Sequence, residues 1–303
     1  MITILVPSYN HDKYIVECLA ALAKLPVGDA RIIMLDDGST DHTVKKARAY
    51  LDSIANSNFE IIVKENGGLV SSLVLGLSIC DTSYFYLVAS DDIPNAEGIL
   101  SCVTWLDNNP QAAFCIGGGK NFFDDEQGAT TPVYRPKHEV FFNCSPDVRH
   151  EKLFLDYPSP ILLQSTVFRT KALKEIGGWD QQLILDDLPT FIKLLTKYPK
   201  YGKDFIFLPD VEVVGYRQHR TNSYRNLQKQ FLMVTQVYRK LAPANLITKS
   251  IGNTLAYYTL AGLRRKEFTK VVAIWRGTSS AERYYSFLGM SKMMFWKLIG
   301  ASK

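Results

Sequence analysis

Positions 31–40 read RIIMLDDGST, an apolar β-rich run that stops abruptly at two aspartates and a turn. Positions 84–92, YFYLVASDD, repeat that arrangement. Two further apolar β-rich runs are expected strands: Ile2–Val6 and Phe59–Val63. Apolar residues at helical spacing fill the intervals, at about 12–24, 41–56, 69–79 and 94–108. Strands that alternate with helices in this way predict an α/β fold with a mostly parallel sheet flanked by helices.

The alternation weakens after Pro110. The remaining expected strands are 112–116, 164–169, 205–208 and 211–216, and the remaining expected helices are 171–176 and 187–197. Residues 117–160 are rich in Gly, Asp and Pro, which predicts a long irregular excursion. From about Asn226 to the end the pattern is helical and basic, so we expect a helical C-terminal extension.

Charge is divided unevenly along the 303-residue chain. Residues 225–303 hold 14 Lys and Arg against two acids, a formal charge of +12, which leaves 21 basic and 28 acidic residues, or −7, for residues 1–224. An acidic part can hold cations, whereas a basic part can meet the phosphates of lipids, nucleic acids or substrates. The hydrophobic share of 47% is ordinary for a globular protein, which excludes disordered and collagen-like chains.

The five cysteines lie at wide spacings and never as Cys-x-x-Cys, so neither a disulfide framework nor a zinc knuckle is expected. The chain contains no apolar run long enough for a membrane span, and its first residues lack the basic region of a signal peptide. We therefore expect a cytoplasmic protein.

Three pairs of adjacent aspartates carry the candidate chemistry: Asp36-Asp37 and Asp91-Asp92 end two strands, and Asp186-Asp187 opens a helix. Ligands of open α/β sheets bind outside the carboxyl ends of the strands, so the first two pairs are expected at one edge. Like charges gathered there repel unless a cation or a hydrogen-bond network compensates them. Carboxylate oxygens suit Mg²⁺ or Mn²⁺ bound beside substrate phosphates. The alternative is that each pair serves a turn or a helix N-cap.

Short motifs then make the sequence recognisable. They are Val6-Pro7-Ser8-Tyr9-Asn10, Leu35 to Asp41, Glu65-Asn66-Gly67-Gly68, Ala89-Ser90-Asp91-Asp92, Gly177-Gly178-Trp179-Asp180, Leu185-Asp186-Asp187 and Tyr216 to Ser223. In this order they resemble the family 2 glycosyltransferases of GT-A fold over about residues 1–225. The resemblance implies a nucleotide-sugar half at about 1–110 and an acceptor half at about 111–225, and it leaves 226–303 as a separate basic helical segment.

The resemblance also implies roles for the first loops. Pro7, Tyr9 and Asp37 match the positions that hold the base of a nucleotide-sugar. Asn66 matches the loop beside the nucleotide, and Asp91 matches the contact with the ribose. A carboxylate at Asp37 accepts the imide N–H of uracil, so UDP is the favoured nucleotide. The compound dTDP shares that imide edge, and GDP is left open.

The same resemblance implies which residues bind a metal ion and which residue is the general base. Asp92 matches the ligand of a divalent cation, Mn²⁺ or Mg²⁺, that bridges the diphosphate, and His219 matches a further metal ligand. Asp187 matches the general base, which takes the proton of the acceptor hydroxyl so that one displacement inverts the anomeric carbon.

Three further residues are implied on the acceptor side: Gly178, Trp179 and Asp186. Glycine lets the backbone approach a sugar closely. Trp179 has two interpretations, stacking on a sugar face or packing in the core.

The resemblance therefore implies a metal-dependent inverting glycosyltransferase with a glycan or lipid-linked acceptor, in bacterial surface-polysaccharide assembly such as capsule or O-antigen. The alternative is a catalytically inactive nucleotide-sugar-binding relative, against which the intact Asp92, Asp187 and His219 argue. A phospho-acceptor receiver module would leave Asp186-Asp187 unexplained. A Rossmann dehydrogenase requires a Gly-x-Gly-x-x-Gly motif that residues 4–10 lack.

The C-terminal segment mixes basic residues with aromatic ones, at Trp275, Tyr284, Tyr285, Phe295 and Trp296. This mixture fits a helix lying on an anionic membrane surface, which would put the protein on the inner face of the cell membrane. The alternative is a helical subdomain that packs on the rest of the protein or mediates oligomers. A nucleic-acid partner is not expected, because no reading motif is present and the larger part of the chain is acidic.

Overall fold

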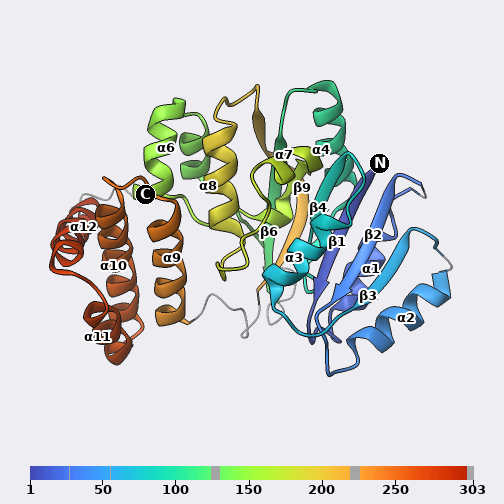
Figure 1. The fold of residues 1–303 in the computed structure, drawn as a ribbon, viewed down its shortest axis with the longest axis horizontal. Helices are drawn as coiled ribbons and strands as arrows, with labels where there is room; N and C mark the ends of the chain where they lie inside the picture. The colour runs from blue at the N-terminus through green and yellow to red at the C-terminus, as the bar shows by residue number, and fades with distance from the viewer. Residues whose placement is uncertain (27, 55, 124–129, 219–225, 299–303) are drawn as a thin grey trace. The chain divides into compact units, whose positions relative to one another are not determined.

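The computed structural model describes residues 1–26, 28–54, 56–123, 130–218 and 226–298. It divides into two compact units (Figure 1). The sheet unit comprises Met1–Asn143 and Pro160–His219, and the helical unit comprises Cys144–Ser159 and Arg220–Lys303. The helical unit thus takes in Cys144–Ser159, a segment that the sequence places within the acceptor half.

The sheet unit is built on one mixed sheet with the strand order β3-β2-β1-β4-β8-β6-β9-β5, and β7 pairs with β6. The strands are β1 (Ile2–Ser8), β2 (Ala30–Asp36), β3 (Phe59–Val63), β4 (Tyr84–Leu87), β5 (Ile93–Pro94), β6 (Phe114–Phe123), β7 (Thr130–Pro132), β8 (Thr166–Arg169) and β9 (Phe205–Gln218). Strands β3, β2, β1 and β4 are parallel, which confirms the alternating pattern. β8 is antiparallel to both β4 and β6 and so ends the parallel half.

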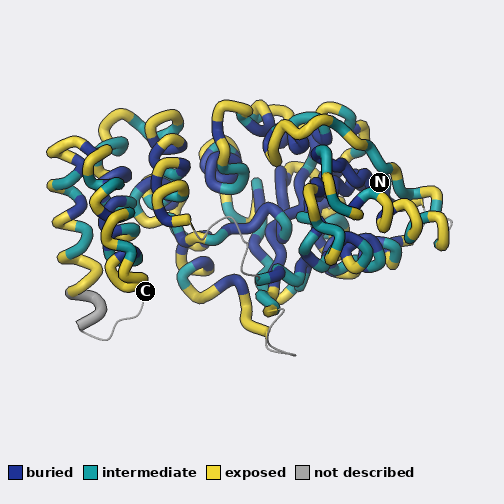
Figure 2. The backbone as a smooth tube through the Cα atoms, turned by 90° about the horizontal axis from the view of Figure 1, so that it is seen from below, coloured by how far each residue is buried: buried dark blue, intermediate teal, exposed yellow. Residues whose placement is uncertain are grey.

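Helices flank this sheet, whose strands β1, β2 and β4 are buried almost throughout; Figure 2 colours the backbone by burial. They are α1 (Ile15–Leu22), α2 (Thr43–Ile54), α3 (Leu69–Ser78), α4 (Ala96–Asn108), α5 (Pro136–Phe142), the 3₁₀ helix η1 (Leu163–Ser165), α7 (Thr170–Glu175) and α8 (Asp187–Lys197). α3 packs on β1 and β2, where Gly76 lies against Leu5. α4 packs on β6, β8 and β9.

The largest departure from the expected fold lies at residues 117–160. This region is not an irregular excursion: it extends β6 to Phe123 and adds β7, α5 and α6 (Pro146–Leu155). Its prolines, which favour loops in a sequence pattern, lie instead at helix starts. Pro136 and Pro146 each occupy the first turn of a helix, where the missing N–H costs no hydrogen bond.

A run of glycines explains why β9 is one strand. The sequence predicts two strands on either side of Pro209-Asp210, but β9 runs unbroken beside β6. Register shifts between Gly117 and Gly118, and between Gly118 and Gly119, absorb the extra residues of β9. A β-carbon at Gly118 would lie 2.0 Å from the Pro209 carbonyl oxygen, so only glycine permits this approach.

The helical unit is a bundle organised around one helix. It contains α6, α9 (Leu227–Leu241), α10 (Ile247–Arg264), α11 (Phe268–Arg276) and α12 (Ser280–Leu298). α10 packs on α6, α9, α11 and α12, which is why Cys144–Ser159 belongs to this unit. Ile251, Leu255 and Ala256 of α10 are buried, and Gly252 and Gly289 bring α10 and α12 close together.

A buried acid, Glu282, starts α12. Its side chain is 4% exposed. Arg239 Nη2 donates to Oε1 at 2.9 Å, and the Ser279 N–H donates to Oε2 at 2.7 Å. The Glu282 N–H donates in return to Ser279 Oγ at 3.3 Å, which completes a reciprocal cap of the helix. Glu282 therefore has both carboxylate oxygens engaged.

The outer side of the bundle carries exposed apolar side chains. We call the following residues the α11–α12 apolar surface: Phe268, Val272, Tyr284, Phe287, Leu288 and Met294, all exposed. The Phe287 ring lies 5.3 Å from the Trp275 ring, which joins the α11 part to the α12 part. None of the described helices combines the length and the hydropathy that a membrane span requires.

Candidate active site

The loops that follow β1 and β2 are held against each other. The parallel register sets Ser8 beside Asp36, at the carboxyl ends of the two strands. Beyond them, the Thr40 N–H donates to Asn10 Oδ1 at 2.8 Å, and the Asn10 N–H donates to Ser39 Oγ at 2.8 Å. Asn10 adopts the left-handed conformation, φ 54°, which Asn tolerates better than most residues. The strand-end loops therefore converge as the sequence predicts.

Asp37 is buried at this edge, with 4% exposure. Lys64 Nζ and the Gly67 N–H donate to Oδ1, and the Gly68 N–H donates to Oδ2 at 2.8 Å. Burial opposes ionisation of the carboxyl, but these donors outweigh it, so the pKa of Asp37 is lowered. Since a carboxylate offers about four acceptor positions, Asp37 can still accept an N–H from a ligand.

The other residues assigned to the nucleotide differ in exposure. Tyr9 is 46% exposed, and Asn66 is also exposed. Pro7 is buried within β1, opposite Leu35 of β2. Tyr9 and Asn66 thus offer side chains to a ligand, whereas Pro7 shapes the strand end.

The turn after β4 carries the second acid pair. Ser90 is buried, with its Oγ 2.7 Å from His11 Nδ1, and Asp91 Oδ1 lies 3.9 Å from the same nitrogen. Asp92 is 1% exposed. The Arg217 N–H donates to Asp92 Oδ1 at 2.9 Å, while Oδ2 has no hydrogen-bond partner in the described part of the chain. Burial, reinforced by the charge of Asp91, raises the pKa of Asp92 well above its usual value.

The unpartnered oxygen of Asp92 fits a cation. A buried carboxylate oxygen without a donor is costly unless a positive charge compensates it. Across the described ranges, no three His, Cys, Asp or Glu side chains gather closely enough to form a metal site by themselves. His219, the second expected ligand, lies outside the described residues. Asp92 alone still suits Mg²⁺ at a diphosphate, because that ion takes one or two carboxylates and fills its shell with phosphates and water.

The third acid pair lies at the start of α8. Asp186 is the N-cap residue, and Asp187 Oδ1 accepts the Leu188 N–H at 2.6 Å. Both acids keep partial contact with solvent, yet the surrounding protein weakens the hydration of their carboxylates and raises both pKa values. This desolvation, together with the charge of Asp186, raises the pKa of Asp187 to about 7. A carboxyl of that pKa is suited to general-base work.

Both the second and the third acid pair interact electrostatically with η1 or with a residue bonded to it. The Gln164 side chain of η1 lies near enough to Asp92 to favour its ionised form, although no hydrogen bond of normal geometry joins it to Oδ2. The neighbouring Ser165 Oγ lies 2.5 Å from the Tyr134 hydroxyl. Burial and, to a lesser degree, the charge of Asp187 raise the pKa of Tyr134 to about 12. Asp92 thus interacts electrostatically with η1 itself, and Asp187 with Tyr134, a hydrogen-bond partner of η1.

Trp179 takes one of the two roles that its sequence leaves open. The side chain is 6% exposed, and its ring lies 5.9 Å from the Phe85 ring. The ring therefore packs in the core, as the second interpretation expects, and stacking on a sugar face stays a prediction. Gly178, before it, has φ +56° and accepts a hydrogen bond from Lys193 at its carbonyl oxygen.

Sequence reasoning assigned no role to Arg217, which the structure places at the second acid pair. Its backbone N–H bonds Asp92, and its Nε donates to the Asp91 carbonyl at 2.6 Å. The motif containing Arg217 was recognised for its histidine. The place of Arg217 beside this acid pair is visible only in the structure, where β9 pairs with β5 and β6 and so brings distant segments together.

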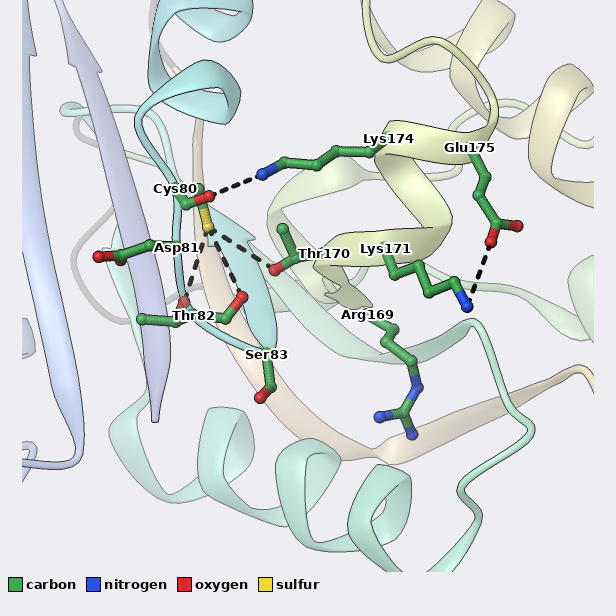
Figure 3. Close-up of a pocket in the computed structure, with 9 residues that line it drawn as sticks. All are labelled: Cys80, Asp81, Thr82, Ser83, Arg169, Thr170, Lys171, Lys174 and Glu175. Carbon is green, nitrogen blue, oxygen red and sulfur yellow. Dashed lines mark hydrogen bonds and ion pairs between the residues drawn. The ribbon is translucent and has the colours of Figure 1, made fainter.

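A separate hollow of about 610 Å³ lies at the amino end of β4 (Figure 3). It is lined by Cys80, Asp81, Thr82, Ser83, Arg169, Thr170, Lys171, Lys174 and Glu175. Lys174 Nζ donates to the Cys80 carbonyl at 2.8 Å, and Lys171 pairs with Glu175. None of the three acid pairs lines this hollow, so it is not the candidate active site.

Comparison with known sequences identifies the family of the chain. The model of glycosyl transferase family 2 matches residues 3–175. An uncharacterized glycosyltransferase from Haemophilus influenzae is 30% identical over 220 residues, 67% of this chain and 66% of that protein. Glycosyltransferase GlyG from Streptococcus pneumoniae is 34% identical over 129 residues, 42% of each. The matched segments thus span between about two fifths and two thirds of these relatives' length.

Solved structures show the same fold. A mannosyltransferase from Pyrobaculum calidifontis in complex with GDP-Man and Mn²⁺ has a TM-score of 0.59 at 18% identity, covering 97% of this chain and 80% of that one. TarS 1-349 from S. aureus in complex with UDP-GlcNAc has a TM-score of 0.63 at 18% identity, covering 90% of this chain and 79% of that one. Because the family model spans more than half of the sequence, and because the fold is that of GT-A enzymes, this chain belongs to glycosyl transferase family 2.

Proposed function

We propose that this glycosyltransferase moves a sugar from a nucleotide-sugar, preferably a UDP-sugar, to a hydroxyl of a glycan or lipid-linked acceptor, with inversion. One observation carries the proposal. The acid pairs supply both a buried carboxylate oxygen without a described hydrogen bond, on Asp92, and a carboxyl of near-neutral pKa, on Asp187. The first suits a cation, and the second suits a base.

The donor would bind at the loops after β1, β2 and β3. Tyr9 and Asn66 are exposed there, and Asp37 retains capacity to accept the imide N–H of uracil. Asp91 is assigned to the ribose, on the turn that also carries Asp92. The relatives solved with GDP-Man and with UDP-GlcNAc support a nucleotide-sugar as donor.

Asp92 would hold a divalent cation, Mn²⁺ or Mg²⁺, with His219 as a further ligand. When bound, such a cation offsets the charge that develops on the leaving diphosphate. The unpartnered Oδ2 of Asp92 supports this assignment, and so does the Mn²⁺ in the Pyrobaculum relative.

Asp187 would accept the proton of the acceptor hydroxyl. As the acceptor oxygen forms its bond to the anomeric carbon, the bond from that carbon to the diphosphate oxygen breaks on the opposite face. One such displacement inverts the configuration and needs one base. Gly178 and Asp186 are assigned to the acceptor side because they lie close to Asp187 along the chain, with Trp179 supporting them from the core.

We assign the enzyme to bacterial surface-polysaccharide synthesis, such as O-antigen or capsule, at the inner face of the cell membrane. A poly-beta-1,6-N-acetyl-D-glucosamine synthase from Staphylococcus epidermidis, 21% identical over 194 residues, is among its relatives. The α11–α12 apolar surface supports a peripheral contact, because the same helices and the end of α10 carry the exposed basic residues Arg264, Arg276 and Lys292. An anionic lipid surface complements both features.

The test is a screen of nucleotide-sugars with Mn²⁺, read first as thermal stabilisation and then as transfer to sugar acceptors. We expect a UDP-sugar to stabilise the protein, EDTA to abolish transfer, and Mn²⁺ or Mg²⁺ to restore it. Full turnover in excess EDTA would contradict the metal role. Binding of a nucleotide-sugar with no transfer to any acceptor, and no hydrolysis, would favour an inactive binding protein.

The membrane contact is tested by co-sedimentation with vesicles. The protein should sediment with anionic vesicles at low salt, be released by high salt, and ignore neutral vesicles. An Arg276→Gln, Lys292→Gln double variant should bind less, whereas a protein that ignores anionic vesicles has no such contact.

A further inference from the structure

The guanidinium of Arg217 is enclosed by residues from three parts of the sheet unit. The side chain is 8% exposed. Its Nε donates to the Asp91 carbonyl oxygen at 2.6 Å, and its Nη2 pairs with the Glu17 carboxylate. The guanidinium carbon lies 4.7 Å from the centre of the Tyr14 ring and 4.5 Å from that of Phe122. A planar cation held between two rings and two acceptors has little freedom to move.

The same residue also fixes the neighbouring carboxylate. The backbone N–H of Arg217 donates to Asp92 Oδ1 at 2.9 Å. One residue of β9 thus holds the main chain of Asp91 through its side chain and the side chain of Asp92 through its main chain. With Oδ1 bonded in this way, Asp92 Oδ2 is the oxygen without a partner in the described chain.

We propose that Arg217 is a positioning residue for the cation at Asp92, an inference that rests on the metal role proposed above. By holding the turn and by bonding Oδ1, Arg217 keeps Oδ2 available and keeps two adjacent carboxylates from separating by repulsion. Partners that orient a metal-binding carboxylate commonly affect metal affinity about 10–100-fold when they are removed.

The chain offers a matched control in Arg169. Its Nε donates to the Ala112 carbonyl at 2.9 Å and its Nη2 donates to the Leu106 carbonyl at 3.0 Å. Its guanidinium carbon lies 5.3 Å from the Tyr84 ring centre. Arg169 is therefore also an arginine that bonds main-chain carbonyls beside an aromatic ring, but it is at the amino end of β4, away from the acid pair.

The experiment compares Arg217→Gln, Arg217→Lys and Arg169→Gln in the full chain. Mn²⁺ affinity is measured with UDP present from the electron paramagnetic resonance signal of free Mn²⁺. Uridine affinity is measured in EDTA, and thermal stability is measured for every variant. We expect Arg217→Gln to weaken Mn²⁺ binding about 10–100-fold, with uridine affinity unchanged and Arg217→Lys in between. Arg169→Gln should lower thermal stability and leave Mn²⁺ affinity unchanged.

Two results would overturn the inference. One is Mn²⁺ affinity of Arg217→Gln equal to that of the wild type, and the other is an equal loss in Arg169→Gln. Should Arg217→Gln not fold, Arg217→Lys carries the test, because it keeps the charge and loses the planar fork. If the wild-type protein itself binds no Mn²⁺ with UDP, the metal role of Asp92 fails first, which separates that failure from a failure of Arg217.

Discussion

One buried acid in each unit makes an informative contrast. In the sheet unit, Asp92 keeps one carboxylate oxygen without a described partner, and its pKa is raised. In the helical unit, Glu282 has both oxygens bonded, to Arg239 and to the Ser279 N–H. The helical unit instead exposes the apolar side chains of the α11–α12 apolar surface. This contrast is in keeping with the two proposals, a cation bound at Asp92 and a lipid surface met by the helical unit.

Changing one acid to its amide in each unit gives the largest expected difference in turnover. Asp187→Asn should lower turnover about 10²–10⁴-fold, because a positioned base contributes that much. Its donor affinity should remain near that of the wild type, since the base acts on the acceptor. Steady-state kinetics and UDP titration measure the two quantities.

The matched change in the helical unit is Glu282→Gln, which should keep the turnover of each folded molecule. A collapse of donor affinity in Asp187→Asn with turnover per bound donor preserved would show that Asp187 is not the base.

Asp37→Ala should weaken UDP binding by about 1.5–3 kcal/mol, the range for hydrogen bonds to a charged group. Binding of pyrophosphate, which lacks the base, should change little. Calorimetric titration of both ligands measures the difference.

Asp41→Ala is the control, because Asp41 lies in the same loop region and its carboxylate also accepts hydrogen bonds, from Thr43 and the Asp12 N–H. Equal losses for UDP and pyrophosphate in Asp37→Ala would mean that Asp37 only supports the loop through Lys64, Gly67 and Gly68.

The stability of the metal-free protein tests the contrast between Asp92 and Glu282 directly. Asp92→Asn should raise the free energy of unfolding by about 0.5–2 kcal/mol, because it removes a buried, incompletely paired charge. Glu282→Gln should lower it by about 1.5 kcal/mol, because it breaks a charged hydrogen bond. Urea unfolding in EDTA measures both. Destabilisation of equal size by the two changes would remove the distinction between the units.

The pH dependence gives the smallest expected effect. As the proposed base, Asp187 would act only when ionised, so with a pKa of about 7 the rate should rise with pH and level off above neutrality. At one pH unit below that pKa we expect about a tenfold loss. Because the folded pKa exceeds the unfolded value, Asp187 also takes stability away as pH rises from about 4 to 7. A rate profile flat between pH 5 and about 8 would contradict the assignment.

The parallel half of the sheet was predictable because its signals are local. Ile2–Ser8 and Ala30–Asp36 each end at a polar residue, Ser90 follows soon after Tyr84–Leu87, and helical spacing fills the gaps. The carboxyl ends of parallel strands lie at one edge of a sheet, and this rule predicts that the loop of Asn10 lies beside the loop of Thr40, as observed. The acid pairs were therefore located from the sequence pattern, and the resemblance to a family supplied their expected roles.

The rest depends on contacts between distant residues. Glycines at 117–119 predict a loop on their own, and only the approach of Pro209 makes them part of a strand. The partners of Arg217, among them Glu17, Asp91 and Phe122, lie far away in the chain, so no local pattern could mark it. Burial of Trp179 against Phe85 likewise follows from packing and not from its motif.

The close contact of β6 with β9 has a consequence for interpreting tolerance to mutation. In a saturation-mutagenesis map scored by activity, Gly117 and Gly118 should be as intolerant as Asp187, because a β-carbon at either would meet β9 at 2.3 Å or less. An observer of activity alone would count these glycines among the residues that touch substrate. Scoring soluble yield beside activity separates the two kinds of intolerance, since glycine variants fail to accumulate while Asp187 variants accumulate without activity. Positions of this protein that tolerate no substitution therefore fall into two kinds. At one kind the backbone leaves no room for a side chain, and at the other the side chain takes part in the chemistry.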